Sequence, residues 1–296
     1  MNSSESSMLL EKTENRLLHQ ARLVLYQFLS LALSCPQEKT WKRLKNPEFK
    51  ELLEGAVSVL KEVPRDSSFS LAPLELSPEF FDFSLMQQFF QNSYEEIAEE
   101  YQRTFGLLMS RECPPYQTEY CPQTFSVYRS HQIADIAGYY AAFGIEPSRQ
   151  FPLRADHIVL EFEFMAWVIS KALYAEDDGE SDGEAICKEA QKKFFQEHLV
   201  WWVPAFASAL HRKAEGITND SNKEYITSRS YYGQLSILLA SFIPLERNFF
   251  QVAPPTELIT PNMQIQEESS SPENCEECPL ASSDPKSEFT CEENPS

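Results

Sequence analysis

Titratable side chains interrupt an apolar helical pattern at residues 154–165, which read R-A-D-H-I-V-L-E-F-E-F-M. Asp156, His157, Glu161 and Glu163 all belong to this run. Polar groups of this kind cost free energy when they are buried without a partner. The run is therefore a candidate site, for which acid–base chemistry, metal binding and recognition of a basic ligand must be weighed.

On an ideal helix His157, Glu161 and Phe164 share one face, and Asp156 and Glu163 share another. One interpretation makes Asp156 an N-terminal cap or first-turn acid and leaves both glutamates ion-paired or exposed. A second makes the run part of a peptide-binding surface, where carboxylates receive arginine side chains and neighbouring aromatic rings receive apolar ones. A third is metal binding by His157 and Glu161, which are four residues apart.

Metal-dependent catalysis is the weakest of these interpretations. Carboxylate-bridged bundle sites use Glu-x-x-His on two helices, and this sequence has no such motif. The His157–Glu161 pair has the reverse order and a different spacing, and Glu197 and His198 are adjacent. Common nucleotide-binding, metalloprotease and hydrolase motifs are missing as well. We therefore predict a binding protein, not an enzyme, with no catalytic residues, no resident metal and no cofactor.

The C-terminal region offers the alternative function, a metal-binding or redox-sensing helical protein. Cys275 and Cys278 have C-x-x-C spacing, and Cys291 follows them. Structural zinc sites use four ligands, so these three cysteines are weak metal candidates.

Outside residues 154–165, the polar residue His198 lies within an apolar helical stripe that includes Phe195, Trp202 and Phe206. We interpret this stripe as core, with His198 hydrogen-bonded to a backbone or carboxylate partner. Pro204 predicts a kink or break in the helix that carries the stripe.

Helices must position all of these residues. Only 8 glycines occur in 296 residues, helix formers are abundant, and 42% hydrophobic residues can fill a substantial core. The sequence predicts an all-α bundle of about ten helices. The clearest apolar periodicities lie at residues 17–32, 41–60, 84–105, 123–143, 153–174, 185–214 and 228–250.

Proline, glycine and charge divide the chain. Gly144 gives a helix stop, and we predict an N-terminal part at 1–145, a hinge at 146–152 and a C-terminal helical part at 153–251. Residues 176–184 are mostly acidic and are predicted to form a solvated loop. Residues 252–296 contain ten acidic residues and a single lysine, and we expect a disordered acidic tail.

Charge and hydropathy indicate the partners. A net charge of -20 argues against nucleic acid and anionic membranes and favours a basic ligand. The most apolar runs, 199–210 and 235–245, are shorter than the roughly 20 residues of a membrane span, so no stable membrane insertion is expected. The first residues have no secretory signal pattern, and seven scattered cysteines suit reduced thiols. We expect a cytoplasmic protein, monomeric or dimeric.

Five segments, in order, resemble the TorD/DmsD/NarJ family of cytoplasmic chaperones for molybdenum-containing enzymes. They are A-R-L-V-L-Y-Q-F-L-S-L-A-L-S-C-P at 21–36, E-E-Y-Q-R-T-F-G at 99–106 with P-P-Y-Q-T-E-Y at 114–120, Y-A-A-F-G-I at 140–145, D-H-I-V-L-E-F-E-F-M at 156–165, and F-F-Q-E-H-L-V-W-W-V-P-A-F at 194–206. The resemblance covers roughly residues 15–250. The chain departs from the family pattern at Thr104, at Thr118 and in a longer hinge before Asp156.

The resemblance implies a two-part helical chaperone without catalytic activity. Its partners would be an apo molybdopterin-dependent oxidoreductase and that enzyme's twin-arginine signal peptide or N-terminal peptide, held until the cofactor is inserted and before export. The acidic residues of the site suit two arginines, and its aromatic residues suit the apolar stretch that follows them. The predicted peptide-binding residues are Asp156, His157 and Glu161 at the polar end, with Phe105, Pro115, Tyr116, Tyr120, Phe164 and Trp202 as walls or support.

Overall fold

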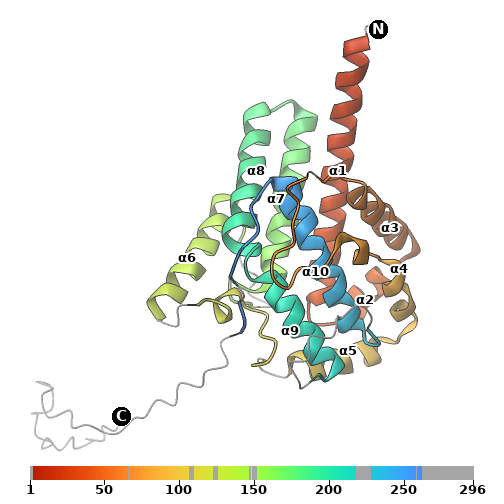
Figure 1. Cartoon of the computed structure of the whole chain (residues 1–296), viewed down its shortest axis with the longest axis vertical. Coiled ribbons are helices and arrows are strands. Elements are labelled where there is room, and N and C mark those ends of the chain that lie inside the picture. The colour runs from red at the N-terminus through yellow and green to blue at the C-terminus, as the bar shows by residue number, and fades with distance from the viewer. Residues whose placement is uncertain are drawn as a thin grey trace, which may run out of the picture. The chain divides into compact units, whose positions relative to one another are not determined.

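The computed structural model describes residues 3–65, 67–106, 110–122, 126–146, 148, 152–217, 228–257 and 259–261. Ten α-helices are present in these residues, which confirms the all-α prediction (Figure 1). They are α1 Ser3–Leu33, α2 Glu38–Leu44, α3 Pro47–Lys61, α4 Ser84–Gln87, α5 Tyr94–Phe105, α6 Ser126–Ala142, α7 Ile158–Asp178, α8 Ser181–Phe194, α9 Val203–Glu215 and α10 Tyr231–Phe250. Residues 262–296 lie outside the described residues, and with them most of the acidic tail predicted at 252–296 and its three cysteines. At the start of that predicted tail, Val252 and Ile259 pack against the core.

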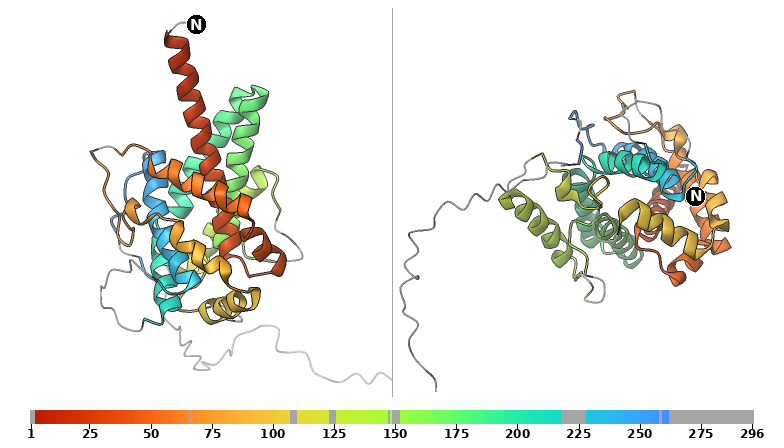
Figure 2. Two further views of the ribbon diagram at one scale, coloured as in Figure 1. Left: turned by 90° about the vertical axis from the view of Figure 1, so that its right-hand side faces the viewer. Right: turned by 90° about the horizontal axis from the view of Figure 1, so that it is seen from below.

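The core surrounds α10. Every residue of this helix except Phe249 is buried, as expected for a helix that is apolar on all sides. Helix α9 packs along α10, and α1 packs against both α3 and α7 (Figure 1 and Figure 2). Helix α8 covers another face of α7. None of the helices in the described residues is both long and apolar enough to cross a membrane.

Two predicted helices are each divided by a capping sequence. The stretch 41–60 is split because Asn46 accepts hydrogen bonds from the backbone nitrogens of Glu48 and Phe49, and Pro47 occupies the first turn of α3. The stretch 84–105 is split because Ser93 and Glu96 form a capping box that starts α5. Apolar periodicity alone does not detect such starts.

The prediction of an acidic loop at 176–184 is wrong. Helix α7 continues to Asp178 and α8 begins at Ser181, so only Gly179 and Glu180 separate them. Gly179 has a φ of 74°, which ends α7 without steric cost. Arg16 of α1 pairs with Asp177 at 2.9 Å, which stabilises the acidic end of α7.

The predicted helix at 185–214 is broken as its proline suggested. A π-helical turn, η4 (Phe195–Leu199), follows α8, and Pro204 lies in the first turn of α9. The Val200 backbone nitrogen donates to the Phe195 carbonyl oxygen at 2.9 Å, five residues earlier.

Helix α6 ends near the predicted stop. Gly144 has a φ of 68°, and the Ile145 backbone nitrogen donates to the Tyr140 carbonyl oxygen at 2.9 Å. The chain then reaches the predicted hinge, of which Glu146, Ser148 and Pro152 are described. The two-part division around this hinge stays a prediction, because packing in one conformation does not test whether the parts move.

Candidate functional site

The Pro-Pro-Tyr segment fixes the start of α7. Tyr116 and His157 form an antiparallel bridge. The Gln117 backbone nitrogen donates to the Asp156 carbonyl oxygen at 2.9 Å, and the Ile158 nitrogen donates to the Pro115 carbonyl oxygen at 3.0 Å. These contacts hold together two segments that are about 40 residues apart in sequence. Pro115, Tyr116, Asp156 and His157, which were predicted to belong to one site, therefore lie side by side.

Asp156 is completely buried and already has partners. Its carboxylate accepts from the Thr118 hydroxyl at 2.7 Å, from the Thr118 backbone nitrogen at 3.1 Å and from Arg154 Nη2 at 3.0 Å. The chain's own arginine therefore occupies the position that a ligand arginine would take. Arg154 Nε donates to the same carboxylate at 2.5 Å, so the threonine at 118, a departure from the family pattern, supplies two of its four donors.

The N-cap of α7 is His157, so the assignment of Asp156 to that role is wrong. His157 Nδ1 accepts a hydrogen bond from the Val159 backbone nitrogen at 3.2 Å. Burial lowers the pKa of His157 to about 4, so the imidazole is neutral at pH 7 and its nitrogen can accept.

Glu161 is also completely buried, so its interpretation as ion-paired or exposed is wrong. Its Oε2 accepts from Trp202 Nε1 at 3.3 Å, and its Oε1 has no hydrogen-bond partner in the described residues. Burial raises the pKa of this carboxyl well above its ordinary value, and the nearby Asp156 raises it further. Burial therefore favours the neutral acid over the anion that a cationic ligand would need.

The remaining predicted residues pack into the interior. The Tyr120 ring lies 5.3 Å from that of Trp202, Phe164 lies 4.5 Å from Phe194, and Phe105 packs elsewhere, 5.4 Å from Tyr232. Tyr116 alone among the nine is half-buried, with the Arg154 guanidinium 4.3 Å from its ring centroid. Direct peptide binding by these nine residues stays a prediction; in this structure eight of them are buried.

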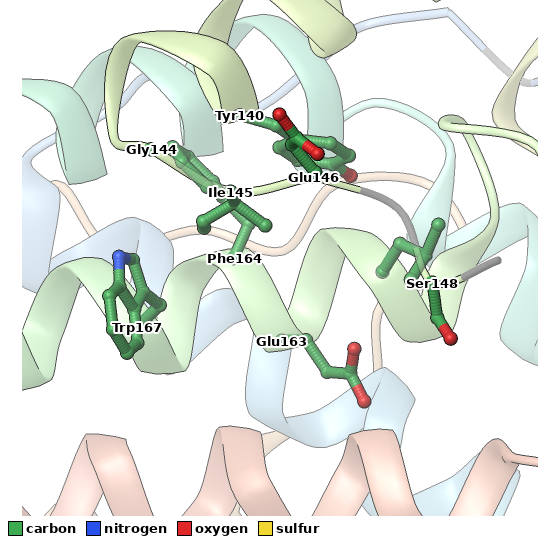
Figure 3. Close-up of a pocket in the computed structure, with 9 residues that line it drawn as sticks. Tyr140, Gly144, Ile145, Glu146, Ser148, Glu163, Phe164 and Trp167 are labelled. Atoms are coloured by element: carbon green, nitrogen blue, oxygen red, sulfur yellow. The ribbon is translucent and has the colours of Figure 1, made fainter. Parts of the chain in front are cut away.

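An open pocket of about 400 Å³ lies next to this buried group, between the end of α6 and the outer face of α7 (Figure 3). Its size is within the range of roughly 300–1,000 Å³ that is usual for ligand sites. Side chains from α7 form one wall and the residues after α6 form the other, as Figure 3 shows. The lining residues are Tyr140, Gly144, Ile145, Glu146, Ser148, Leu160, Glu163, Phe164 and Trp167.

The pocket combines an aromatic wall with two carboxylates. The Trp167 side chain is 43% exposed, and the Lys171 ammonium lies 4.9 Å from its ring centroid, so this ring already attracts a cation. Glu146 and Glu163 are both accessible to solvent. The walls partly desolvate Glu163 and raise the pKa of its carboxyl.

Of the lining residues, only Phe164 was among the predicted site residues. A pattern in the sequence does point to the others: Leu160, Glu163, Phe164 and Trp167 are spaced by three, one and three residues, which defines a second stripe on α7. A stripe that mixes apolar, aromatic and acidic side chains resembles an ordinary helix boundary, so it is not distinctive without the wall from residues 140–148.

The described residues thus form a helical bundle with buried polar residues at the start of α7 and an acidic, aromatic pocket beside them. Residues 75–208 match the family model described as nitrate reductase delta subunit. This match supports the predicted resemblance to the NarJ/TorD-type family of chaperones for molybdoenzyme maturation. The matched segment includes the Pro-Pro-Tyr loop, the pocket and η4. No curated protein matches the chain.

Proposed function

We propose that this protein is a dedicated cytoplasmic chaperone that binds the twin-arginine signal peptide, or an N-terminal peptide, of an apo molybdenum-containing oxidoreductase. The peptide binds in the pocket between the end of α6 and α7. Binding holds the client for cofactor insertion and assembly before export, and no bond is made or broken. The family match supports the client class, and the acidic and aromatic pocket supports the mode of recognition.

The observation that carries the proposal is the pairing of Glu163 with Trp167 on adjacent turns of α7, both open to solvent. An arginine can donate to the Glu163 carboxylate and place its guanidinium plane near an aromatic ring. Ile145, Leu160 and Phe164 then offer an apolar surface for the residues that follow the arginines. Hydrogen bonds to a charged group contribute about 1.5–3 kcal/mol, enough for selectivity between arginine and neutral residues.

Calorimetry with a peptide that carries Arg-Arg and an apolar run, compared with a matched Gln-Gln peptide, tests the proposal. We expect the Arg-Arg peptide to bind at least about tenfold more tightly, and more weakly at high salt. Glu163→Gln should reduce this preference about tenfold, and Trp167→Ala should weaken both peptides. Because the Glu163 pKa is raised, the preference should fade as the pH falls through that pKa, when the carboxylate becomes neutral.

Tyr174→Ala is the matched control, because Tyr174 is a 66% exposed aromatic residue on the same helix and does not line the pocket. Equal binding of the two peptides, or equal effects of Trp167→Ala and Tyr174→Ala, contradicts peptide recognition in this pocket. Mass spectrometry of proteins captured from the native host by the wild-type chain but not by Trp167→Ala then identifies the client.

A further inference from the structure

A second polar cluster lies where α6 meets the π-helical turn η4, apart from the peptide pocket. Asp135 and Tyr139 are on consecutive turns of α6, and Glu197 and His198 are in η4. One ligand atom from each of Asp135, Glu197 and His198 lies within 4.8 Å of the other two. The carboxylates are exposed and the imidazole is buried, so the cluster opens to solvent on one side.

His198 Nε2 is the atom that indicates a ligand. The side chain is 1% exposed, and Nε2 has no hydrogen-bond partner in the described residues. Asp135 Oδ2 is only 3.1 Å from Nε2, but it lies off the direction that a hydrogen bond from the ring nitrogen requires. Two ligands of a tetrahedral metal ion, each about 2.1 Å from it, are roughly 3.3 Å apart and do not point at each other. The observed pair has this arrangement.

Partners in the surrounding structure hold the ligands in place. The Tyr139 hydroxyl donates to Glu197 Oε2 at 2.8 Å. The side-chain amide of Gln117 lies next to His198 Nδ1, and Gln117 Oε1 has no hydrogen-bond partner in the described residues. Gln117 Nε2 also donates to Gln132 Oε1 at 3.3 Å, so both amides must rotate by 180° together. The rotation places Gln117 Oε1 against His198 Nδ1–H, which leaves the Nε2 lone pair free for a metal ion. A carbonyl oxygen behind the imidazole is a common support for a metal-binding histidine.

The π turn explains why adjacent residues can both take part. In a regular α-helix Glu197 and His198 would point about 100° apart. The wider turn reduces this angle, and π turns occur frequently at functional sites.

We propose that Asp135, Glu197 and His198 bind a divalent first-row transition-metal ion, for which Zn²⁺ is the probe. Two carboxylates and one imidazole are ligands that Zn²⁺ accepts, and the solvent side leaves a fourth position for water. The ion joins α6 to η4 and stabilises the helix that carries Tyr140 of the peptide pocket. The site does not depend on the tail cysteines or on the proposed peptide.

Zinc titration by calorimetry, on protein that has been treated with a chelator and dialysed, tests the site. The full chain should carry Cys275→Ser, Cys278→Ser and Cys291→Ser, so that the tail thiols do not contribute. We expect one equivalent of Zn²⁺ to bind. Asp135→Asn and Glu197→Gln should each weaken binding at least about tenfold, and Tyr139→Phe should weaken it by about the same factor or less. Glu62→Gln, an exposed acid at the end of α3, should leave it unchanged.

Thermal unfolding gives a second measurement. Zn²⁺ should raise the Tm of the chain without tail cysteines and of its Glu62→Gln variant, but not that of its Asp135→Asn variant, because a ligand stabilises only a fold that binds it. Asp135 is exposed, so Asp135→Asn is expected to keep its fold, and circular dichroism checks this. If one equivalent does not bind, or if Asp135→Asn and Glu62→Gln bind Zn²⁺ equally, the proposed site is wrong.

Discussion

Glu161 and Glu163 are two residues apart on α7, yet they face opposite environments. Glu161 lies in the core against Trp202, whereas Glu163 lines the open pocket. Burial raises the pKa of both carboxyls, far more for Glu161. Burial favours the neutral form of Glu161, and Glu163 is the carboxyl that is accessible to a cationic peptide.

The raised pKa of Glu161 has a consequence for stability. The folded protein binds this proton more tightly than the unfolded chain, so its contribution to stability is complete below the unfolded pKa of about 4.3 and is lost as the pH rises toward the folded pKa. Glu161→Gln removes this loss. We expect the variant to gain stability relative to wild type between pH 5 and pH 8, as measured by urea unfolding. A stability difference that is the same at both pH values would show that Glu161 does not ionise in this way.

At the scale of helices, a buried ion pair links the first helix to the last. Arg22 of α1 donates to both carboxylate oxygens of Glu246 of α10, at 2.7 and 2.9 Å. Gln191 of α8 accepts a further hydrogen bond from Arg22, and the Tyr26 hydroxyl donates to Glu246. Because both charges are buried and fully paired, removing one leaves the other without compensation.

This pair predicts a strongly non-additive effect on stability. Glu246→Leu alone should destabilise the protein by about 3–5 kcal/mol, whereas Arg22→Met with Glu246→Leu should recover most of that loss. Urea unfolding of the two single variants and the double variant measures the coupling. Lys42 and Glu38 form an exposed pair four residues apart, and the same cycle there should show a much smaller coupling. Additive effects at Arg22 and Glu246 would contradict the role of the buried pair.

At the scale of the whole molecule, contacts join the two parts predicted from sequence. The ring centroids of Tyr26 in α1 and Phe162 in α7 are 5.6 Å apart. Glu100 of α5 accepts a hydrogen bond from the Tyr232 backbone nitrogen at the start of α10, at 2.8 Å. Each part would therefore expose apolar core surface if it were separated from the other.

Cutting the chain at the predicted hinge tests whether the two parts depend on each other. With a protease site inserted between residues 146 and 152, we expect the two fragments to stay associated after cleavage. They should co-elute in gel filtration with the helical content of the uncut protein. Separation into two folded fragments would instead show that the parts are independent domains.

The sequence by itself determined the helical class, the stop at Gly144, the break at Pro204 and the resemblance to the family. These depend on local chemistry: glycine reaches positive φ, proline lacks a donor, and apolar residues at helical spacing need a core. Sequence reasoning missed the starts of α3 and α5, where a cap competes with continued apolar spacing.

Only the tertiary structure decided which polar residues are available. Along residues 156–165 the sequence places four titratable side chains on two helix faces and cannot tell which face is covered. Packing against Thr118, Arg154 and Trp202 buries Asp156 and Glu161, whereas the segment after α6 forms an open pocket beside Glu163. The physical reason is that solvation of a carboxylate depends on neighbours distant in sequence, which local spacing does not record.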